Sequence, residues 1–206
     1  MSKTITLALT GASGMPYGMR LLESLLAAGH TVYLVYSQAA QFVAAQEMNL
    51  NLPTKTSEAH RLLSERYRCR PEQLLVFARE DWNAPIASGT GAADAMVVCP
   101  CTMGALAAIA NGLSDNLIER AADVMLKEGR KLVLVPRETP FSAIHLENML
   151  KLSRMGAVML VPNPGFYHLP KSVDDIVDFV VAKILDQLGV EHQLVEKWGS
   201  VALPNL

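Results

Sequence analysis

The stretch Thr4-Ile-Thr-Leu-Ala-Leu-Thr-Gly-Ala-Ser-Gly-Met-Pro-Tyr-Gly18 decides the fold of this chain. A β-branched and apolar run ends in a glycine-rich turn, and a helical pattern begins near Tyr17. A strand that turns directly into a helix presents backbone N–H groups and the positive end of a helix dipole, which together favour an anion. We therefore expect a phosphate site at this turn.

The usual dinucleotide fingerprint is absent from this turn. Gly11, Gly14 and Gly18 do not have the spacing G-x-G-x-x-G. The next predicted strand ends in Ser37, where an NAD site would place an acidic residue for the ribose hydroxyls. Because a serine suits another phosphate contact, the pattern favours a mononucleotide such as FMN over NAD. A plain strand-to-helix turn without a ligand is the alternative.

Strands and helices alternate along the rest of the chain. Apolar runs predict strands at residues 4–9, 31–36, 74–77, 95–98, 131–136 and 157–161. Helical patterns fill residues 17–28, 39–47, 57–67, 116–128 and 142–154, with further helices after residues 102 and 172. This alternation predicts a Rossmann-like or flavodoxin-like α/β fold, in which a parallel sheet is flanked by helices in three layers. Ser172 and Asp175 have the spacing of a capping box at the start of the last helix.

Composition limits the possible partners. Half of the 206 residues are hydrophobic, only 18% are charged, and the mean hydropathy is +0.22, so we expect apolar surface to be buried between subunits. The net charge of −2 gives no reason to expect nucleic acid or an anionic membrane as a partner. Residues 95–114 carry no charge, which raises the question of a membrane span. Pro100 and Gly112 within them favour a buried strand followed by a buried helix instead.

The cysteines and histidines predict no metal site. Cys99 and Cys101 are too close in a strand to pair without strain, and neither they nor the histidines have the spacing of metal ligands. We expect reduced, buried thiols in a cytoplasmic protein.

Several polar residues lie where the sheet is predicted to end. Arg137 and Glu138 follow a buried strand, and Tyr167 lies in the loop after the last one. Arginine binds phosphate bidentately and a carboxylate beside it can move protons. Each has an ordinary alternative: a solvated turn for the Arg–Glu pair, and a packed loop aromatic for Tyr167. Ordinary alternatives also exist on the helices: a solvated helix end for Glu47, a surface charge for Lys127, and for Lys183 an apolar stem packed along the helix with its charge in water.

Taken together, several segments strongly resemble the UbiX-type flavin prenyltransferases over residues 4–198. They are Thr10-Gly-Ala-Ser-Gly14, Cys99-Pro-Cys-Thr-Met-Gly104, Asp115-Asn-Leu-Ile-Glu-Arg-Ala-Ala-Asp123, Leu134-Val-Pro-Arg-Glu138, His145-Leu-Glu-Asn-Met-Leu150 and Pro164-Gly-Phe-Tyr-His168. The resemblance implies one flavoprotein domain over residues 1–206, with a C-terminal tail, 190–206, that contributes Trp198. It also implies a homo-oligomer, a dodecamer, with sites at subunit interfaces.

The activity that the resemblance implies is prenyl transfer. A dimethylallyl group from dimethylallyl phosphate is joined to N5 and C6 of reduced FMN without a metal. The product, prenylated FMN, is delivered to UbiD-type decarboxylases, including those of ubiquinone biosynthesis or of aromatic acid decarboxylation. The sequence leaves open whether the donor is a monophosphate or a diphosphate.

The resemblance also assigns roles to single residues. FMN contacts are expected at Gly11, Ala12, Ser13, Ser37, Thr102, Met103, Gly104, Ala105 and Arg137. Contacts with the dimethylallyl phosphate are expected at Tyr167, Lys183, Lys127, Arg137 and Trp82, and catalytic roles at Glu138, Ser13, Glu47, Lys127 and Trp198. Some relatives have arginine where this chain has Lys183. Lysine keeps the positive charge but lacks the guanidinium group that binds a phosphate through two hydrogen bonds.

Two other functions compete with this one. An FMN-dependent cysteine decarboxylase of the same superfamily would share the fold, but it needs a histidine early in the chain, and the first one after Gly14 is His30 in a predicted turn. A non-catalytic flavin carrier subunit would need no second phosphate site, which Lys127, Arg137 and Tyr167 would supply.

Overall fold

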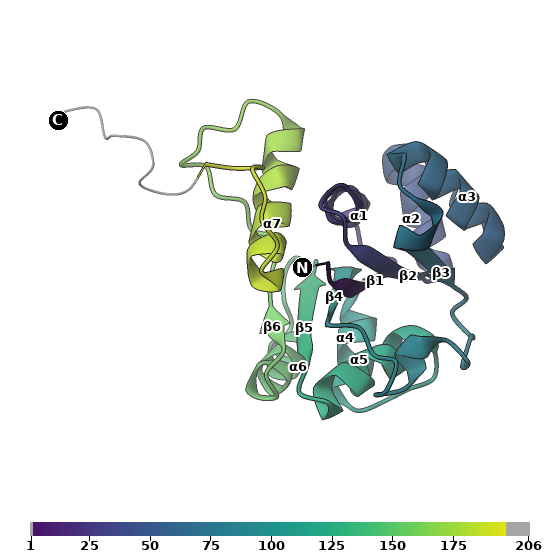
Figure 1. The fold of residues 1–206 in the computed structure, drawn as a ribbon. Coiled ribbons are helices and arrows are strands. Elements are labelled where there is room, and N and C mark those ends of the chain that lie inside the picture. Colours follow the sequence, from purple (N-terminus) through teal and green to yellow (C-terminus); the bar gives the residue numbers. More distant parts are fainter. Residues whose placement is uncertain (1, 197–206) are drawn as a thin grey trace.

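The computed structural model describes residues 2–196. Its centre is a six-stranded sheet in which every pair is parallel and the strand order is β3-β2-β1-β4-β5-β6 (Figure 1). The strands are β1 Thr4–Leu9, β2 Thr31–Tyr36, β3 Leu74–Phe77, β4 Ala95–Cys101, β5 Lys131–Pro136 and β6 Val158–Met159. This is the strand order of a Rossmann-type doubly wound sheet, so the predicted fold class is confirmed.

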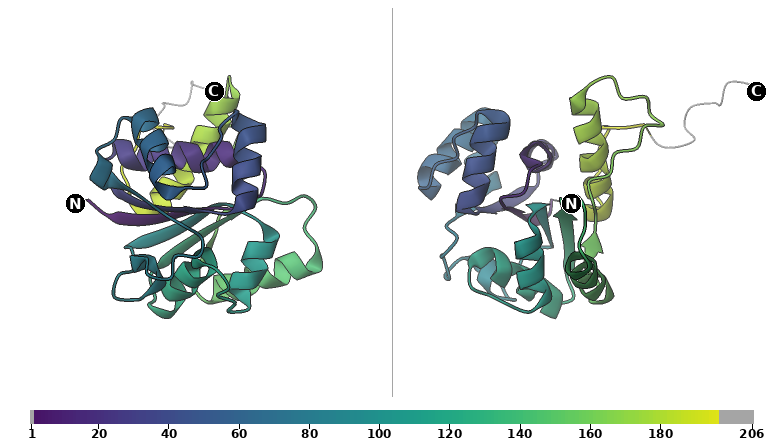
Figure 2. Two further views of the ribbon diagram at one scale, coloured as in Figure 1. Left: turned by 90° about the vertical axis from the view of Figure 1, so that its right-hand side faces the viewer. Right: turned by 180° about the vertical axis from the view of Figure 1, so that it is seen from behind.

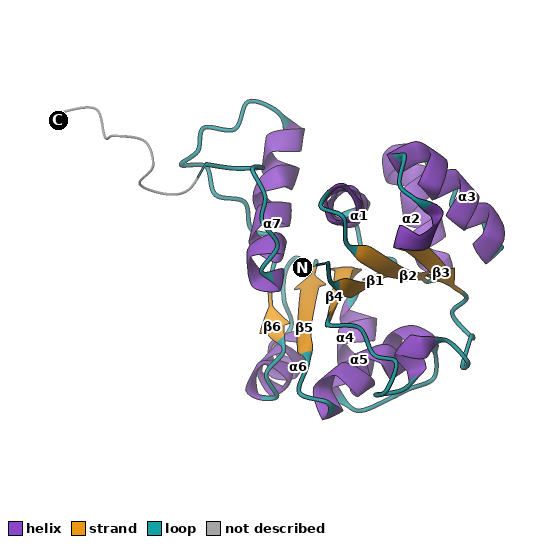
Figure 3. Ribbon diagram, viewed as in Figure 1, coloured by secondary structure: helices purple, strands orange, loops and turns teal. Residues whose placement is uncertain are grey.

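Helices cover both faces of the sheet, which is the middle of three layers (Figures 2 and 3). One face carries α1 Met15–Ala27, α2 Gln38–Met48, α3 Thr56–Tyr67 and α7 Val173–Leu188. The other carries α4 Met103–Ala110, α5 Leu117–Lys127 and α6 Ala143–Arg154. Short 3₁₀ turns, η1 Pro71–Gln73 and η2 Pro85–Ala87, flank β3 and precede β4.

The alternation of side chains along each strand divides the core in two. Leu7 and Val133 pack beneath α1 and α7, whereas Ala8 and Leu134 pack against α4 and α5. Because successive residues of a strand point to opposite faces, a strand covered on both sides reads as a continuous apolar run. No helix of the described residues is long and apolar enough to cross a membrane.

Two strands differ from the prediction at their ends. β4 continues to Cys101, where it pairs with Pro136 after a register shift, although the sequence predicted an end at residue 98. β6 has two residues instead of the five predicted. Pro162 and Pro164 follow it closely, and a residue without an N–H cannot extend a ladder.

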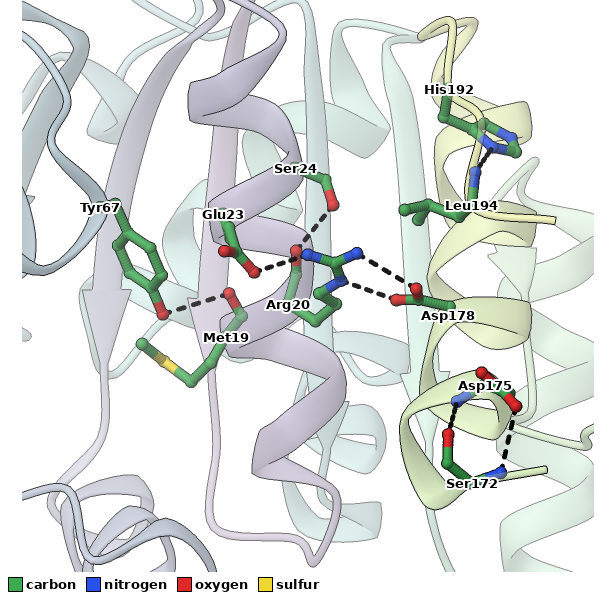
Figure 4. Close-up of polar contacts among 10 residues, drawn as sticks. All are labelled: Met19, Arg20, Glu23, Ser24, Tyr67, Ser172, Asp175, Asp178, His192 and Leu194. Carbon is green, nitrogen blue, oxygen red and sulfur yellow. Dashed lines mark hydrogen bonds and ion pairs between the residues drawn. The ribbon is translucent and has the colours of Figure 1, made fainter. Parts of the chain in front are cut away.

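Helices α1 and α7 lie side by side and are joined by an ion pair (Figure 4). The Arg20 guanidinium donates to both carboxylate oxygens of Asp178, at 2.6 and 3.1 Å, and to Glu23 at 2.7 Å. The predicted capping box at the start of α7 is confirmed, since the side chain of Ser172 and that of Asp175 each accept from the other's backbone N–H.

The sheet has two unlike edges, which matter for the site. We call the edge where the strands end the carboxyl edge, and the other the amino edge. α7 returns to the amino edge, because Lys131 at the start of β5 donates to the carbonyl of Gln187 at 2.7 Å, and Lys3 donates to that of Leu188 at 2.5 Å. α5 returns there too, since only three residues separate Lys127 from β5.

Candidate active site

The carboxyl ends of β1 and β4 meet where the strand order reverses. β1 connects to β2 on one side, while β4 lies on its other side. Open parallel sheets bind ligands in the crevice at such a point. A pocket of about 190 Å³, which we call the switch-point pocket, lies there. It is lined by Thr10, Gly11, Ser37, Ala39, Arg79, Thr102, Ala105, Asn116, Ile118 and Glu119.

Three helices begin around the switch-point pocket, each with a polar cap. Ser37 caps α2 by accepting from the Ala40 N–H at 3.1 Å. Thr102 caps α4 and Asn116 caps α5 in the same way. The positive ends of three helix dipoles therefore point toward one small volume, which favours a bound anion there.

The start of α4 is the most open of the three. The hydroxyl of Thr102 accepts from the Ala105 N–H at 3.1 Å. No hydrogen bond to the N–H groups of Met103 or Gly104 occurs among the described residues. A Cβ at Gly104 would have no neighbour within 4 Å, so the backbone is accessible. Helix N–H groups in this state are ready to bind an anion.

The start of α1 differs from the sequence prediction, because an anion of the protein itself lies there. The carboxylate of Glu47 accepts from the N–H of Gly14 at 3.0 Å and from that of Met15 at 2.8 Å. The next residue, Pro16, has no N–H. The glycine-rich turn therefore does not offer the α1 start to a phosphate. Glu47, whose ordinary alternative was a solvated helix end, is a capping group.

Gly11 contributes to the pocket by being small. A Cβ at this position would lie 2.3 Å from the Cβ of Ala39, so the β1–α1 turn and the start of α2 are in contact there. Any larger residue would separate the two elements that line the pocket. Ala12, predicted with it, is buried.

The end of β5 lies beside the same turn. The Arg137 N–H donates to the carbonyl of Cys101 at 3.3 Å, and its side-chain Nε donates to the carbonyl of Ser13 at 3.3 Å. Glu138 follows with its carboxylate accepting from the Thr139 N–H at 3.1 Å. Ser13, Arg137 and Glu138 are thus together at the carboxyl edge, as the sequence predicted.

Two other predicted residues lie in a separate place, on the outer side of α7. Tyr167 packs edge-on against Phe179 with ring centroids 5.8 Å apart. The ammonium of Lys183 lies 5.8 Å from the centroid of the Phe179 ring and 3.5 Å from the carboxylate of Asp186. A pocket of about 290 Å³, here the α7 pocket, lies among these side chains.

Lys127 is not part of either group within one chain. It lies at the end of α5, at the amino edge, and is paired with Glu128. Within one chain Lys127 and Arg137 lie at opposite ends of the sheet, because α5 ends at the amino edge and Arg137 follows the carboxyl end of β5. The expected role of both residues at one phosphate stays a prediction, made for sites at subunit interfaces. Trp82 is half exposed in the loop after β3, and Trp198 lies outside the described residues.

Comparison with known proteins decides the family. The family model described as "Flavoprotein" matches residues 1–185. The flavin prenyltransferase UbiX of Pseudomonas aeruginosa is 55% identical over 195 residues, which are 95% of this chain and 93% of that protein. The chain belongs to the UbiX family of flavin prenyltransferases. The UbiX of Alkalihalophilus pseudofirmus is 50% identical over 97% of this chain and 98% of its own.

Solved structures of UbiX proteins share the fold over their whole length. AnUbiX (PadA1), solved in complex with FMN and dimethylallyl pyrophosphate, has a TM-score of 0.86 at 38% identity, covering 98% of this chain and 100% of its own. A dodecameric FMN-dependent UbiX-like decarboxylase from Escherichia coli O157:H7 has a TM-score of 0.85 at 43% identity, covering 96% and 100%. The FMN-dependent cysteine decarboxylase TvaF is only 20% identical with a TM-score of 0.56, and shows the fold alone.

Sequence reasoning missed six residues of the switch-point pocket in this UbiX-family chain, of which Thr10, Ala39 and Ile118 belong to elements that begin or end there. The other three, Arg79, Asn116 and Glu119, also line it and were not predicted as site residues. The signal for Asn116 was present, because an asparagine immediately before an apolar helical run is typical of an N-cap. Arg79 comes from the loop after β3, and its carbonyl accepts from the N–H of Leu117 at the start of α5 at 2.8 Å, a contact between distant parts of the chain that no local pattern predicts.

The two thiols of β4 are buried in the UbiX-family fold, and burial disfavours their reactive thiolate form. Cys99 and Cys101 are buried and free. Burial raises the pKa of the Cys101 thiol to about 12, and burial followed by the charge of Cys101 raises the pKa of Cys99 further. Among the described residues, no group of three or more His, Cys, Asp or Glu side chains is arranged to hold a metal ion.

Proposed function

We propose that the protein transfers a dimethylallyl group from dimethylallyl phosphate to reduced FMN. The observation that carries the proposal is the presence of two separate places suited to phosphate, the switch-point pocket and the α7 pocket with Lys183. Storage of a flavin needs only one. The AnUbiX structure was solved with FMN and dimethylallyl pyrophosphate together, which supports the same pair of ligands here.

The switch-point pocket fits the phosphate end of FMN. Open N–H groups at the start of α4, the Ser37 hydroxyl and the Arg79 guanidinium all surround it. The flavin then extends over Gly11, Ala12 and Ser13 toward Arg137, as the family resemblance implies. This placement moves the phosphate from the start of α1, which Glu47 occupies, to the starts of α2 and α4.

The flavin supplies N5 and C6 as the atoms that receive the prenyl group, and the protein supplies charge and protons. Lys127, Arg137 and Lys183 neutralise the departing phosphate, which is how a site without a metal stabilises such a leaving group. Glu138 donates a proton to that phosphate and later accepts one. The aromatic faces of Trp82 and Trp198 stabilise positive charge on the allyl group.

These residues come together only in an oligomer. Lys127 lies at the amino edge and Ser13 and Arg137 lie at the carboxyl edge, so one chain does not bring them to one reacting centre. A second copy that presents its Lys127 to the first would complete the site. We propose a homo-oligomer, and a dodecamer as in the UbiX-like protein from Escherichia coli O157:H7.

The product and its destination follow from the same assignment. We propose that prenylated FMN is released to a UbiD-type decarboxylase, and that the protein works in the cytoplasm. A mixture of this protein with the apo-form of such a decarboxylase would test the delivery, because decarboxylation would begin only when both proteins and both substrates are present.

The transfer itself is tested by the mass of the flavin. Purified protein is incubated anaerobically with reduced FMN and dimethylallyl monophosphate, or the diphosphate, without added metal. A gain of one isoprenyl unit is expected, and Glu138→Gln should slow it sharply while Glu147→Gln, an exposed carboxylate on α6, does not. Unmodified flavin with intact binding would contradict the proposal and favour a carrier or a cysteine decarboxylase. A carrier should also be indifferent to Glu138→Gln.

A further inference from the structure

The side chain of Thr10 fastens the end of β1 to the end of β4. Its hydroxyl donates to the carbonyl of Pro100 at 2.8 Å and accepts from the N–H of Thr102 at 2.8 Å. The backbone N–H of Thr10 donates to the same carbonyl at 3.1 Å. Thr10 is only 4% exposed, so this small network is shielded from water.

Thr102 is the residue whose position this network fixes, and Thr102 begins α4. Its own N–H is bound by Thr10, and its hydroxyl is bound by Ala105. The backbone and the side chain of Thr102 are therefore both held in place. This fixes the direction of the next N–H groups, those of Met103 and Gly104, before a ligand binds. Donors held in place in this way bind an anion without the cost of ordering them.

We propose that Thr10 is a positioning residue that aims the start of α4 at the phosphate of the flavin, and that it thereby makes the site select FMN over riboflavin. The inference rests on the proposed function, since it assumes that the phosphate lies in the switch-point pocket. Thr10 lines that pocket as well as holding its wall.

The chemistry of a hydroxyl explains why threonine is needed. A hydroxyl is both a donor and an acceptor, and both capacities are used here. Valine has the same shape but neither capacity, so Thr10→Val would leave the partly buried N–H of Thr102 without its partner, while the Pro100 carbonyl would keep only the bond from the Thr10 backbone N–H. Thr102 would then be free to turn toward another partner. Serine keeps the hydroxyl, and cysteine keeps a weaker donor and acceptor.

The test compares two ligands that differ only in the phosphate. Flavin-free full-length protein is titrated with FMN and with riboflavin, followed by the quenching of flavin fluorescence, and thermal unfolding is measured in parallel. For Thr10→Val the Kd for FMN should rise about tenfold to a hundredfold, the effect of an unpaired buried group, while the Kd for riboflavin changes less than about twofold. Thr10→Ser should restore FMN binding to within about threefold, and Thr10→Cys should fall between the two.

A matched control is available on the same strand. Thr6 is 1% exposed in β1 and takes no part in the network at its end. Thr6→Val should leave the ratio of the two Kd values unchanged. If Thr10→Val fails to fold, the Ser and Cys variants still rank the effect.

Each outcome decides one point. Equal losses of FMN and riboflavin in Thr10→Val, or no loss of FMN, would overturn the role of Thr10. A wild-type protein that binds both flavins equally well would instead contradict the placement of the phosphate. A wild-type protein that binds neither would contradict the proposed function.

Discussion

The carboxylate of Glu47 lies 2.8 Å from the backbone nitrogen of Met15, so the last turn of α2 caps the first turn of α1. A carboxylate near the end of its own helix is unfavourably placed relative to that helix dipole. Its hydrogen bonds also place this carboxylate at the positive end of the α1 dipole, where a negative charge is stabilised. The arrangement ties together two helices on the same face of the sheet.

Replacement of Glu47 should destabilise the protein through α1. We expect Glu47→Ala to lower the free energy of unfolding by about 1–2 kcal/mol, the usual cost of a lost cap, measured by urea denaturation. The same variant opens the α1 start to outside anions, so added phosphate should raise its melting temperature more than that of the wild type. Glu58→Ala, which removes an exposed carboxylate from α3, is the control. Equal responses to phosphate would show that α1 does not need an anion.

Asp178 should matter for the attachment of α7. Its carboxylate binds Arg20 through two hydrogen bonds, and this raises the pKa of the Arg20 guanidinium above its ordinary value. Because the pair is partly buried, we expect Asp178→Asn to cost about 1 kcal/mol of unfolding free energy, more than an exposed pair contributes. Glu58→Gln, which breaks the exposed pair with Lys55, should cost less than about 0.5 kcal/mol. A smaller effect for Asp178 than for Glu58 would contradict the reading of the α1–α7 contact.

Lys127 and Arg137 lie at opposite ends of the sheet in one chain, and this predicts complementation between inactive variants. Lys127→Met and Glu138→Gln should each be nearly inactive when expressed alone. Co-expressed with different tags and purified as mixed oligomers, they should recover about a quarter of the wild-type activity, because random pairing gives that share of sites both native residues. Mixed oligomers that stay as inactive as their parents would show that the two residues act within one chain.

His30 predicts a loss of stability in mild acid. It is buried beside the N-terminal strand, and its Nδ1 accepts from the Lys3 N–H at 3.0 Å. Burial, followed by the charges of Lys3 and the N-terminus, lowers its pKa below the ordinary value of 6.5. The unfolded chain therefore binds this proton more readily, so stability is full above about pH 6.5 and falls as the pH drops from there through the lowered pKa.

Urea denaturation at pH 7.5, 6.5 and 5.5 checks this expectation. His30→Gln keeps a hydrogen-bonding side chain without the titration, so its stability should change less between pH 6.5 and 5.5 than that of the wild type. His60→Gln, a substitution on α3, serves as the comparison. Parallel curves for His30→Gln and the wild type would assign the acid sensitivity to other groups.

Much of this molecule could be predicted from local pattern. The strand β1 and the capped helix α7 were predicted nearly residue for residue, because an apolar run with sharp turns and a capping box are local signals. The ends of β4 and β6 were not predicted correctly. The length of a strand depends on how many residues of the neighbouring strand pair with it, and this is not a local signal. The start of α1 was assigned two residues late, since Pro16 reads as a breaker but suits the first turn of a helix.

The site was harder to predict than the fold. Glycines and a helix start suggest an anion site, but only the structure shows that the anion at α1 is Glu47, thirty-two residues from Met15 in the chain. Arg79 became a candidate only when the structure placed its loop against the start of α5, at the switch-point pocket. The resemblance to a family supplied Lys127 as a site residue without saying from which copy of the chain it comes.

The sulfur atoms at the end of β4 have a practical consequence for a protein that handles a reduced flavin. Oxidants and alkylating reagents attack thiolates, and the raised pKa of Cys101 leaves almost none at neutral pH. These two buried side chains pack like small hydrophobic groups on opposite faces of the sheet, Cys99 toward α1 and α7 and Cys101 toward α4 and α5. Labelling by a maleimide in the native state should therefore be confined to Cys69, the half-buried third cysteine, and the two thiols of β4 should stay unmodified on exposure to air.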